Sequence, residues 1–220
     1  MSARGETVFV DGAFVAADRA RVSVFDRGFQ FGDALFETIR TYCGEPFALR
    51  EHLERMSLGA RALGFAVPWR ESRWRATIRE LLRRNGRLAV DAAVRLTVTR
   101  GAEGRSLLPP PRPKPTVVIA LRAIDPRLPR LRRRGAAVVT VPFHPGFGGL
   151  LAATKTTDYA AAIVAKEAAR RRRAFEAIYR LPDGSLAEGA TTNLFIVEKG
   201  HLRTPPVGAG ILPGVTRRVV

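Results

Sequence analysis

The pattern of apolar and polar positions predicts alternating strands and helices along the whole chain. Two short β-favouring runs flank Asp11-Gly12 and predict an opening hairpin. Helical periodicity predicts helices at 50–63 and 72–84, and a third helix that is capped by Asp158 and runs to about residue 173. Further strands are expected at both ends of 22–42 and at 46–49, 92–101, 116–121, 136–141, 175–181, 186–188 and 193–197. This mixture predicts an α/β (α+β) fold.

Prolines at 126 and 129 interrupt both flanking elements and mark the best candidate for a domain boundary. We expect an N-terminal α/β domain at 1–122, a linker at 123–130 and a C-terminal domain at 131–220. The proline-rich stretch 107–115 is predicted to be a loop or an edge crossing. A glycine turn, Gly146-Phe-Gly-Gly149, is expected shortly before Lys155.

Charge and cysteine content limit the classes of function. The 220 residues include 37 Lys and Arg against 20 Asp and Glu, a formal net charge of +17. The charge is diffuse, and the arginine clusters lack the interleaved aromatic residues that would stack on bases, so nucleic acid is not an expected partner. A single cysteine, Cys43, excludes an internal disulfide. Without a signal peptide or an apolar stretch of ~18 residues, we expect a cytoplasmic protein with no membrane partner.

One lysine points to a specific chemistry. The chain has four lysines among 33 arginines, and Lys155 alone lies in an uncharged stretch, whereas Lys114, Lys166 and Lys199 are expected to be solvated. A lysine can lose its proton and form an imine, which an arginine cannot do. Such a lysine needs an electron sink, commonly pyridoxal phosphate, with a carboxylate that keeps the ring nitrogen protonated. Glu188, between small residues, is the candidate carboxylate.

The phosphate of this cofactor would need backbone N–H groups at a helix N-terminus and a cation. Gly214-Val215-Thr216 has the pattern of a helix start, and Arg55 in the predicted helix 50–63 is the candidate cation. The three histidines are far apart and lack metal-like spacing, so no metal is expected.

The order and spacing of these motifs resemble the class IV aminotransferases, the fold-type IV pyridoxal-phosphate enzymes, over nearly the whole chain. This group holds branched-chain aminotransferases, D-amino-acid aminotransferases and aminodeoxychorismate lyases. The matching motifs are Asp26-Arg-Gly-Phe-Gln-Phe-Gly-Asp-Ala-Leu-Phe-Glu-Thr-Ile-Arg40, His52-Leu-Glu-Arg55, Thr99-Arg-Gly101, Lys155-Thr-Thr-Asp-Tyr159, Glu188-Gly-Ala-Thr-Thr-Asn-Leu-Phe195, Thr204-Pro-Pro and Gly210-Ile-Leu-Pro-Gly-Val-Thr-Arg217.

The resemblance implies a two-domain fold-type IV structure with pyridoxal 5'-phosphate in the interdomain cleft, usually as a homodimer. It implies that Lys155 is the catalytic Schiff-base lysine. The residues that it implies for cofactor binding are Arg55, Tyr159, Glu188, Thr192, Asn193, Val215 and Thr216. Those that it implies for substrate binding are Phe36, Arg40, Arg95 and Arg100.

The expected activity is transfer of an amino group between an amino acid and a 2-oxo acid. The alternative is lyase cleavage of aminodeoxychorismate to 4-aminobenzoate and pyruvate, and a further alternative is an inactive paralogue or a basic binding protein. Chains of this family commonly continue for another helix-and-strand segment after the Gly-Val-Thr-Arg motif. We therefore expect the C-terminal cofactor-binding domain to be incomplete at its end.

Overall fold

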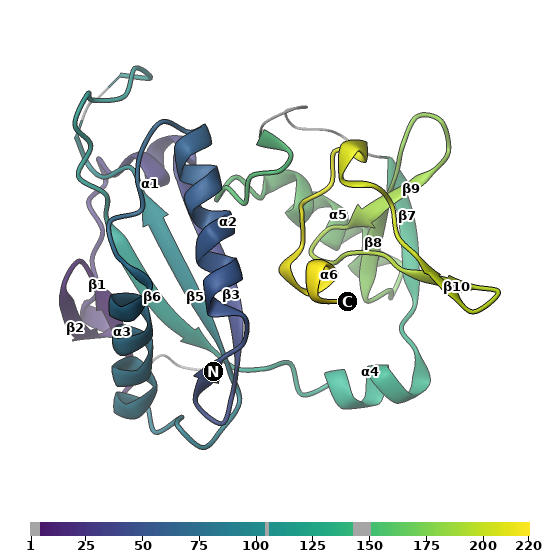
Figure 1. Ribbon diagram of the computed structural model, residues 1–220, viewed down its shortest axis with the longest axis horizontal. Coiled ribbons are helices and arrows are strands. Elements are labelled where there is room, and N and C mark those ends of the chain that lie inside the picture. The colour runs from purple at the N-terminus through teal and green to yellow at the C-terminus, as the bar shows by residue number, and fades with distance from the viewer. Residues whose placement is uncertain (1–4, 104–105, 143–150) are drawn as a thin grey trace. The chain divides into compact units, whose positions relative to one another are not determined.

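The computed structural model describes residues 5–103, 106–142 and 151–220, which form two compact units (Figure 1). Unit 1 is Met1–Ile124 with Thr154–Thr157, and unit 2 is Asp125–Ala153 with Asp158–Val220. The first junction lies inside the expected linker 123–130. The return of Thr154–Thr157 to unit 1 differs from the expected boundaries, which placed all of 131–220 in one domain. The expected glycine turn at 146–149 lies outside the described residues.

Unit 1 is built on a six-stranded sheet in the order β2-β1-β6-β5-β3-β4, in which every pairing is antiparallel. Its strands are β1 (Thr7–Val10), β2 (Ala13–Ala16), β3 (Ala34–Tyr42), β4 (Glu45–Pro46), β5 (Ala92–Thr99) and β6 (Val117–Arg122). The opening hairpin and the strands near 92–101 and 116–121 are confirmed. The longest pairing, β3 with β5, runs from Ala34↔Thr99 to Thr41↔Ala92.

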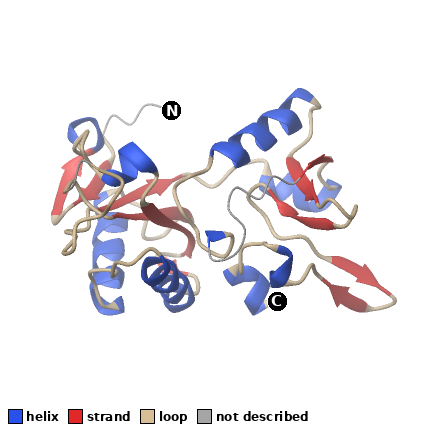
Figure 2. Ribbon diagram, turned by 90° about the horizontal axis from the view of Figure 1, so that it is seen from above, coloured by secondary structure: helices blue, strands red, loops and turns tan. Residues whose placement is uncertain are grey.

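The helices α2 (Leu49–Ala62) and α3 (Glu71–Arg84) pack on this sheet, as Figures 1 and 2 show. Both begin within one residue of the predicted position. Their apolar faces bury Leu53, Met56 and Trp74 against strand residues such as Leu35 and Ile39. This is an amphipathic helix pair covering a sheet, so the apolar core of unit 1 lies between the two layers.

A short helix, α1 (Arg27–Phe31), lies where the sequence predicted only strand ends and a loop. The Asp26 side chain accepts a hydrogen bond from the Gly28 N–H and caps the helix, and Gly32 ends it with a left-handed φ of 68°. The expected strand at the beginning of 22–42 is wrong. A Cβ at Gly28 would lie 2.6 Å from Thr99 Cγ2, so this glycine lets α1 approach β5 closely.

Unit 2 contains a three-stranded sheet in the order β7-β8-β9 and a separate hairpin, β10–β11, which projects as a ribbon in Figure 2. Strand β7 (Val138–Pro142) pairs in parallel with β8 (Glu176–Arg180), so the chain crosses over through α5 (Ala160–Arg171). The other elements of this unit are α4 (Leu128–Arg134), β9 (Leu186–Gly189), β10 (Ile196–Glu198), β11 (His201–Arg203), η3 (Val207–Ala209) and α6 (Val215–Val219).

Two predictions fail in unit 2. The N-cap of α5 is Tyr159, which makes no side-chain capping bond, so Asp158 is not the cap that its position suggested. The strand predicted at 193–197 begins only at Ile196, and the Asn193 side chain donates to Glu188. The short α4 covers part of the expected linker, since Pro129 suits a first helical turn.

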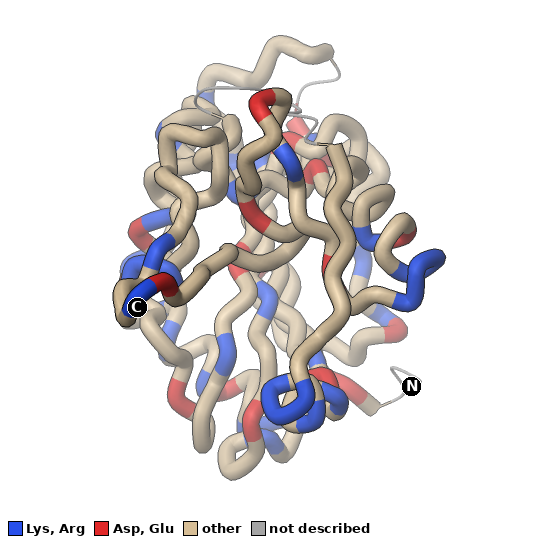
Figure 3. Tube along the Cα trace, turned by 90° about the vertical axis from the view of Figure 1, so that its right-hand side faces the viewer, with Lys and Arg blue, Asp and Glu red and all other residues tan. Residues whose placement is uncertain are grey.

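Basic residues are spread over many elements, with a compact group along α4 (Figure 3). In the part of the chain that the structure describes, no helix is long and apolar enough to cross a membrane. The same residues contain no group of three His, Cys, Asp or Glu side chains that could hold a metal ion.

The buried face of α3 gives a stability prediction. Leu81→Ala removes a fully buried side chain and should destabilise unit 1 by about 3 kcal/mol. Urea unfolding followed by tryptophan fluorescence would report this unit, because both tryptophans, Trp69 and Trp74, belong to it. The matched control is Leu58→Ala on α2, whose side chain is 59% exposed and whose loss should leave the midpoint nearly unchanged. Equal midpoints for the two variants would contradict the packing described here.

Candidate functional site

Lys155 is held by backbone pairing at the edge of β3. The Phe36 N–H donates to the Lys155 carbonyl over 3.0 Å, and the Thr157 N–H donates to the Ala34 carbonyl over 3.0 Å. Leu35 and Thr156 form an isolated antiparallel bridge between these two bonds. The strand β4 pairs only with Thr41 and Tyr42, at the end of β3. The same edge of β3 is therefore open to a further segment at its beginning, near Leu35. Thr154–Thr157 occupies that place, which explains why it belongs to unit 1.

The side chain of Lys155 lies against an aromatic ring. Its Nζ is 4.6 Å from the centroid of the buried Phe36 ring, and Arg95 Cζ is 3.6 Å from the same centroid. Arg95 is paired across the sheet with Thr38, two residues along β3 from Phe36, which places it diagonal to the ring. The structure thus brings together three of the predicted residues, Lys155, Phe36 and Arg95, in unit 1.

The other lysines have different surroundings. Lys114 Nζ pairs with Glu103 over 2.9 Å at an exposed position, and Lys199 lies in the exposed turn between β10 and β11. Lys166 is not simply solvated, as its sequence context suggested. It donates to the Phe175 carbonyl over 2.6 Å and lies 3.2 Å from the buried Glu176 carboxylate.

Arg55 belongs to a buried cluster with Glu37 and His52. The fully buried Glu37 on β3 accepts from Arg55 Nε over 2.8 Å and from Arg55 Nη2 over 2.6 Å. His52 Nδ1 lies 2.7 Å from Glu37 Oε2. His52 and Arg55 are three residues apart on α2 and therefore share the helix face that packs on β3. Glu37 was not among the predicted residues, although its place between aromatic and apolar neighbours in Phe36-Glu37-Thr38-Ile39 marks it as a buried charge that needs a partner.

The Glu37 carboxylate is held in its charged form. Burial alone would raise the pKa of Glu37, but the hydrogen bonds from His52 and Arg55 outweigh burial and hold the pKa below the usual 4.5. A carboxylate that is charged at neutral pH fixes the direction of the Arg55 guanidinium, because a bidentate pair has one preferred geometry.

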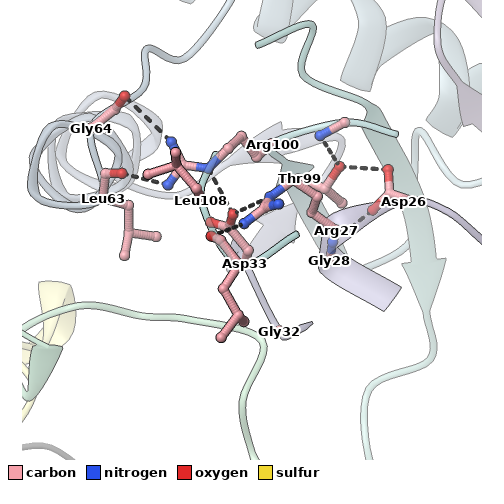
Figure 4. Close-up of polar contacts among 12 residues, drawn as sticks. Asp26, Arg27, Gly28, Gly32, Asp33, Leu63, Gly64, Thr99, Arg100 and Leu108 are labelled. Atoms are coloured by element: carbon pink, nitrogen blue, oxygen red, sulfur yellow. Dashed lines mark hydrogen bonds and ion pairs between the residues drawn. The ribbon is translucent and has the colours of Figure 1, made fainter. Parts of the chain in front are cut away.

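A second charged cluster connects the beginning of β3 with the end of β5. Arg27 Nε and Arg100 Nε both donate to Asp33 Oδ2, over 2.8 and 2.6 Å, and Figure 4 shows the two guanidinium groups converging on this carboxylate. Burial would raise the pKa of Asp33, but the hydrogen bonds from Arg100 and Arg27 hold it below its usual value. The remaining Arg27 nitrogens donate to the carbonyls of Ser106 and Leu107, over 2.6 and 2.9 Å.

These contacts bear on the residues that the resemblance assigned to substrate binding. Arg100 is buried and directs its terminal nitrogens to the carbonyls of Leu63 and Gly64 at the end of α2, which favours a structural role (Figure 4). Arg40 pairs with Asp91 over 2.7 Å and stacks on Tyr42, near the far end of β3 from Lys155. The geometry therefore favours Arg95 over Arg40 and Arg100 as a neighbour of Lys155.

In unit 2, Glu188 and Asn193 form the centre of a polar group. Asn193 Nδ2 donates to Glu188 Oε2 over 3.1 Å, and the Leu212 N–H donates to Glu188 Oε1 over 3.0 Å. Glu188 also lies near Tyr179, whose pKa is raised by burial and then by the charges of Glu188 and Glu176. These bonds fix both oxygens of the half-buried Glu188 carboxylate from within the same unit.

The helix α6 begins beside this group. A Cβ at Gly214, its N-cap, would lie 1.8 Å from Asn193 Oδ1, so the helix start and Asn193 are in close contact. Gly214 provides no side-chain cap, and the first N–H groups of a helix have no partner within the helix itself. Val215 is buried, Thr216 is exposed, and the predicted Thr192 and Tyr159 lie in the same unit.

An open surface depression of about 750 Å³ lies elsewhere in unit 1. It is lined by the end of α2, the residues that follow and the proline-rich crossing: Arg61, Gly64, Phe65, Ala66, Pro68, Pro113 and Pro115. None of the predicted site residues lines it.

Comparisons with known proteins identify the family. Residues 34–220 match the family described as amino-transferase class IV. The chain is 37% identical over 215 residues to a putative branched-chain-amino-acid aminotransferase of Methanocaldococcus jannaschii, covering 97% of this chain and 73% of that protein. It is 33% identical over 214 residues to a D-alanine aminotransferase of Staphylococcus epidermidis, with the same two coverages. The chain belongs to the class IV aminotransferases.

Solved structures of aminotransferases have a similar fold. The fold is similar to a branched-chain aminotransferase from Thermoproteus uzoniensis with norvaline, at a TM-score of 0.84 and 31% identity, covering 97% of this chain and 72% of that one. It is also similar to a hypothetical aminotransferase from Mycobacterium tuberculosis in its PLP-bound form, at a TM-score of 0.84 and 26% identity, covering 96% and 75%. The predicted fold-type IV class is confirmed, and enzymes of this class use pyridoxal phosphate.

The residues present fit this cofactor. Glu188 supplies a fixed carboxylate, which suits a protonated ring nitrogen. Gly214 leaves the start of α6 without a side-chain cap, so its N–H groups suit a phosphate, and Lys155 provides an amine.

A charge-removing variant tests the Glu37 cluster. Glu37→Gln should destabilise unit 1 by about 3 kcal/mol at neutral pH, because Arg55 then lacks its buried counter-charge. Since the folded-state pKa of Glu37 lies below 4.5, its stabilisation is complete above the unfolded-state pKa and is lost as the pH falls through the folded-state value. Urea unfolding by tryptophan fluorescence should therefore show a constant difference from pH 8 to 6 that shrinks below about pH 4.5.

The matched control is Glu71→Gln, which also breaks a glutamate–arginine pair, but an exposed one with Arg75. It should leave stability close to that of the wild type. If the loss of stability caused by Glu37→Gln instead grew as the pH fell, the lowered pKa of Glu37 would be contradicted.

The close contact at Gly214 gives a prediction on cofactor affinity. Gly214→Ala should turn Asn193 away from Glu188 and weaken pyridoxal-phosphate binding about tenfold, as expected for overpacking that costs about 1–3 kcal/mol. Equilibrium titration of the apoprotein would measure this. In the same unit, a Cβ at Gly208 would meet nothing within 4 Å, so Gly208→Ala should leave the affinity unchanged. Similar affinities for the two variants would refute the proposed contact.

Proposed function

We propose that the chain transfers an amino group between an amino acid and a 2-oxo acid, with pyridoxal phosphate linked covalently to Lys155. The observation that carries this proposal is the placement of Lys155, whose backbone is pinned to β3 and whose Nζ lies over the Phe36 ring beside Arg95. Lys114 pairs with Glu103, Lys166 pairs with Glu176, and Lys199 lies in an exposed hairpin turn.

Each remaining residue would then have one task. Glu188, held by Asn193 and the Leu212 N–H, keeps the ring nitrogen of the cofactor protonated. Arg55, oriented by Glu37, and the N–H groups of Val215 and Thr216 at the start of α6 bind the phosphate. Tyr159 and Thr192 complete the cofactor contacts that the family resemblance assigns.

Proton movement would fall to Lys155. When bound, the cofactor supplies the electron sink for the bond changes at the substrate Cα. As a free amine, Lys155 Nζ would accept the proton that leaves the substrate Cα, hold it and later donate it again. Arg95, whose guanidinium lies over the Phe36 ring, would bind a substrate carboxylate near that amine.

We also infer a homodimer and a reducing, cytoplasmic setting. The homodimer expected from the family is supported by apolar side chains that unit 1 leaves exposed. Phe29 on α1 is 74% exposed, and Leu107 and Leu108 are also exposed. A reducing, cytoplasmic setting rests on the single Cys43.

Borohydride reduction of the protein with pyridoxal phosphate, followed by peptide mass mapping, tests the covalent link. The cofactor mass should appear on Lys155 and be lost in Lys155→Ala, whereas Lys199→Ala should keep it. Consumption of a 2-oxo acid together with an amino donor would establish transamination. Release of 4-aminobenzoate and pyruvate from aminodeoxychorismate, without a 2-oxo acid acceptor, would assign the lyase reaction instead. A folded protein that forms no adduct would rule out the proposal.

A further inference from the structure

A buried carboxylate in unit 2 takes no part in the function described above. Glu176, the first residue of β8, is 3% exposed. Its Oε1 accepts from the Ala177 N–H over 2.9 Å and lies 3.2 Å from Lys166 Nζ. Its Oε2 accepts from the hydroxyls of Thr191 over 2.8 Å and Thr192 over 3.4 Å. The carboxylate therefore joins α5 and β8 to the loop that follows β9.

This arrangement is informative because a buried charge is costly. Desolvating a carboxylate costs several kcal/mol, and an apolar residue of similar size would often serve stability as well or better. Among the described residues, the buried members of the apolar cluster beside Glu176 are Ala165, Ala169, Ala177 and Ala190, with Val139, Val141 and Tyr179 packed partly buried against them. The bonds from the Thr191 and Thr192 hydroxyls to Glu176 therefore contribute to the position of the loop that follows β9.

The loop that Glu176 holds separates Glu188 from Asn193. Its ends are tied by the Gly189 N–H, which donates to the Thr192 carbonyl over 2.7 Å. A Cβ at Gly189 would lie 2.1 Å from Thr192 Oγ1 and 3.0 Å from Glu176 Cγ, so the loop closes tightly over the carboxylate. A loop that moved would change the distance between the Glu188 carboxylate and the Asn193 amide that holds it.

We propose that Glu176 is a positioning residue, which acts through the hydroxyls of Thr191 and Thr192 to fix the Glu188–Asn193 pair for the cofactor. This inference rests on the proposed roles of Glu188 and Asn193. Lys166 serves the same arrangement by balancing the charge of Glu176, with its ammonium group also anchored on the Phe175 carbonyl. Of Glu176, Lys166, Thr191 and Thr192, only Thr192 was among the cofactor contacts that the resemblance implied.

The test uses the apoprotein and pyridoxal phosphate. Glu176→Gln and Thr191→Val should each weaken cofactor binding about tenfold, the lower end of the range known for residues that orient a ligand-binding group. The visible band of the bound cofactor should also titrate at a changed pH, because Glu188 would be less well placed against the ring nitrogen. Thr191→Ser keeps the hydroxyl and should restore both properties. Glu167→Gln, an exposed α5 glutamate paired with Arg170, is the matched control and should change neither.

Glu188→Gln separates failure of this inference from failure of the proposed function. If it leaves both the affinity and the band unchanged, the role of Glu188 is wrong and the inference fails with it. If it alters them while folded Glu176→Gln and Thr191→Val do not, only the inference is overturned. A purely structural role for Glu176 would lower the thermal stability of the apoprotein and leave the band unmoved, and Thr191→Ser would then match Thr191→Val. That result would also overturn the inference.

Discussion

Backbone pairing between Thr154–Thr157 and the beginning of β3 is the constraint on which the proposed chemistry of Lys155 depends. Two hydrogen bonds and one bridge attach this segment to Ala34, Leu35 and Phe36, and they fix where the Lys155 side chain begins. Because β4 pairs only with the far end of β3, the sheet leaves this stretch of edge available. An unpaired sheet edge favours unwanted pairing with other chains, and here the edge is occupied by the segment that carries Lys155.

The pleat of β3 then separates two tasks. Successive side chains on a strand point to opposite faces, so Phe36 and Glu37 face different surroundings. Phe36 meets Lys155 and Arg95, whereas Glu37 meets His52 and Arg55 on α2. A register shift of one residue would exchange these faces and place a charge where the ring now lies. The long pairing of β3 with β5 makes such a shift costly.

Long periodic segments and motif residues were readable from the sequence, and tertiary partners were not. The helices α2 and α3 followed from apolar spacing, and Lys155 stood out by its chemistry among arginines. The short α1 was missed because its signal is a single Asp26 cap rather than a period. The return of Thr154–Thr157 to unit 1 was missed because pairing with a distant edge leaves no local pattern. The structural role of Arg100 was missed because its guanidinium donates to Asp33 and to the carbonyls of Leu63 and Gly64, which lie far from it in the sequence.

The two units differ in what holds them together. The core of unit 1 includes large apolar side chains such as Trp74, Ile78 and Leu81, whose burial contributes roughly 1.5–3 kcal/mol each. The apolar residues buried in the described part of unit 2 are mostly small, such as Ala165, Ala169 and Ala177, and the buried charge of Glu176 adds hydrogen bonds to them. A ligand that binds only the folded state adds RT ln(1 + [L]/Kd), about 4 kcal/mol at a thousandfold excess over Kd. A cofactor bound by Glu188 and the start of α6 would thus contribute an appreciable share of the stability of unit 2, and its binding and the order of that unit would be coupled.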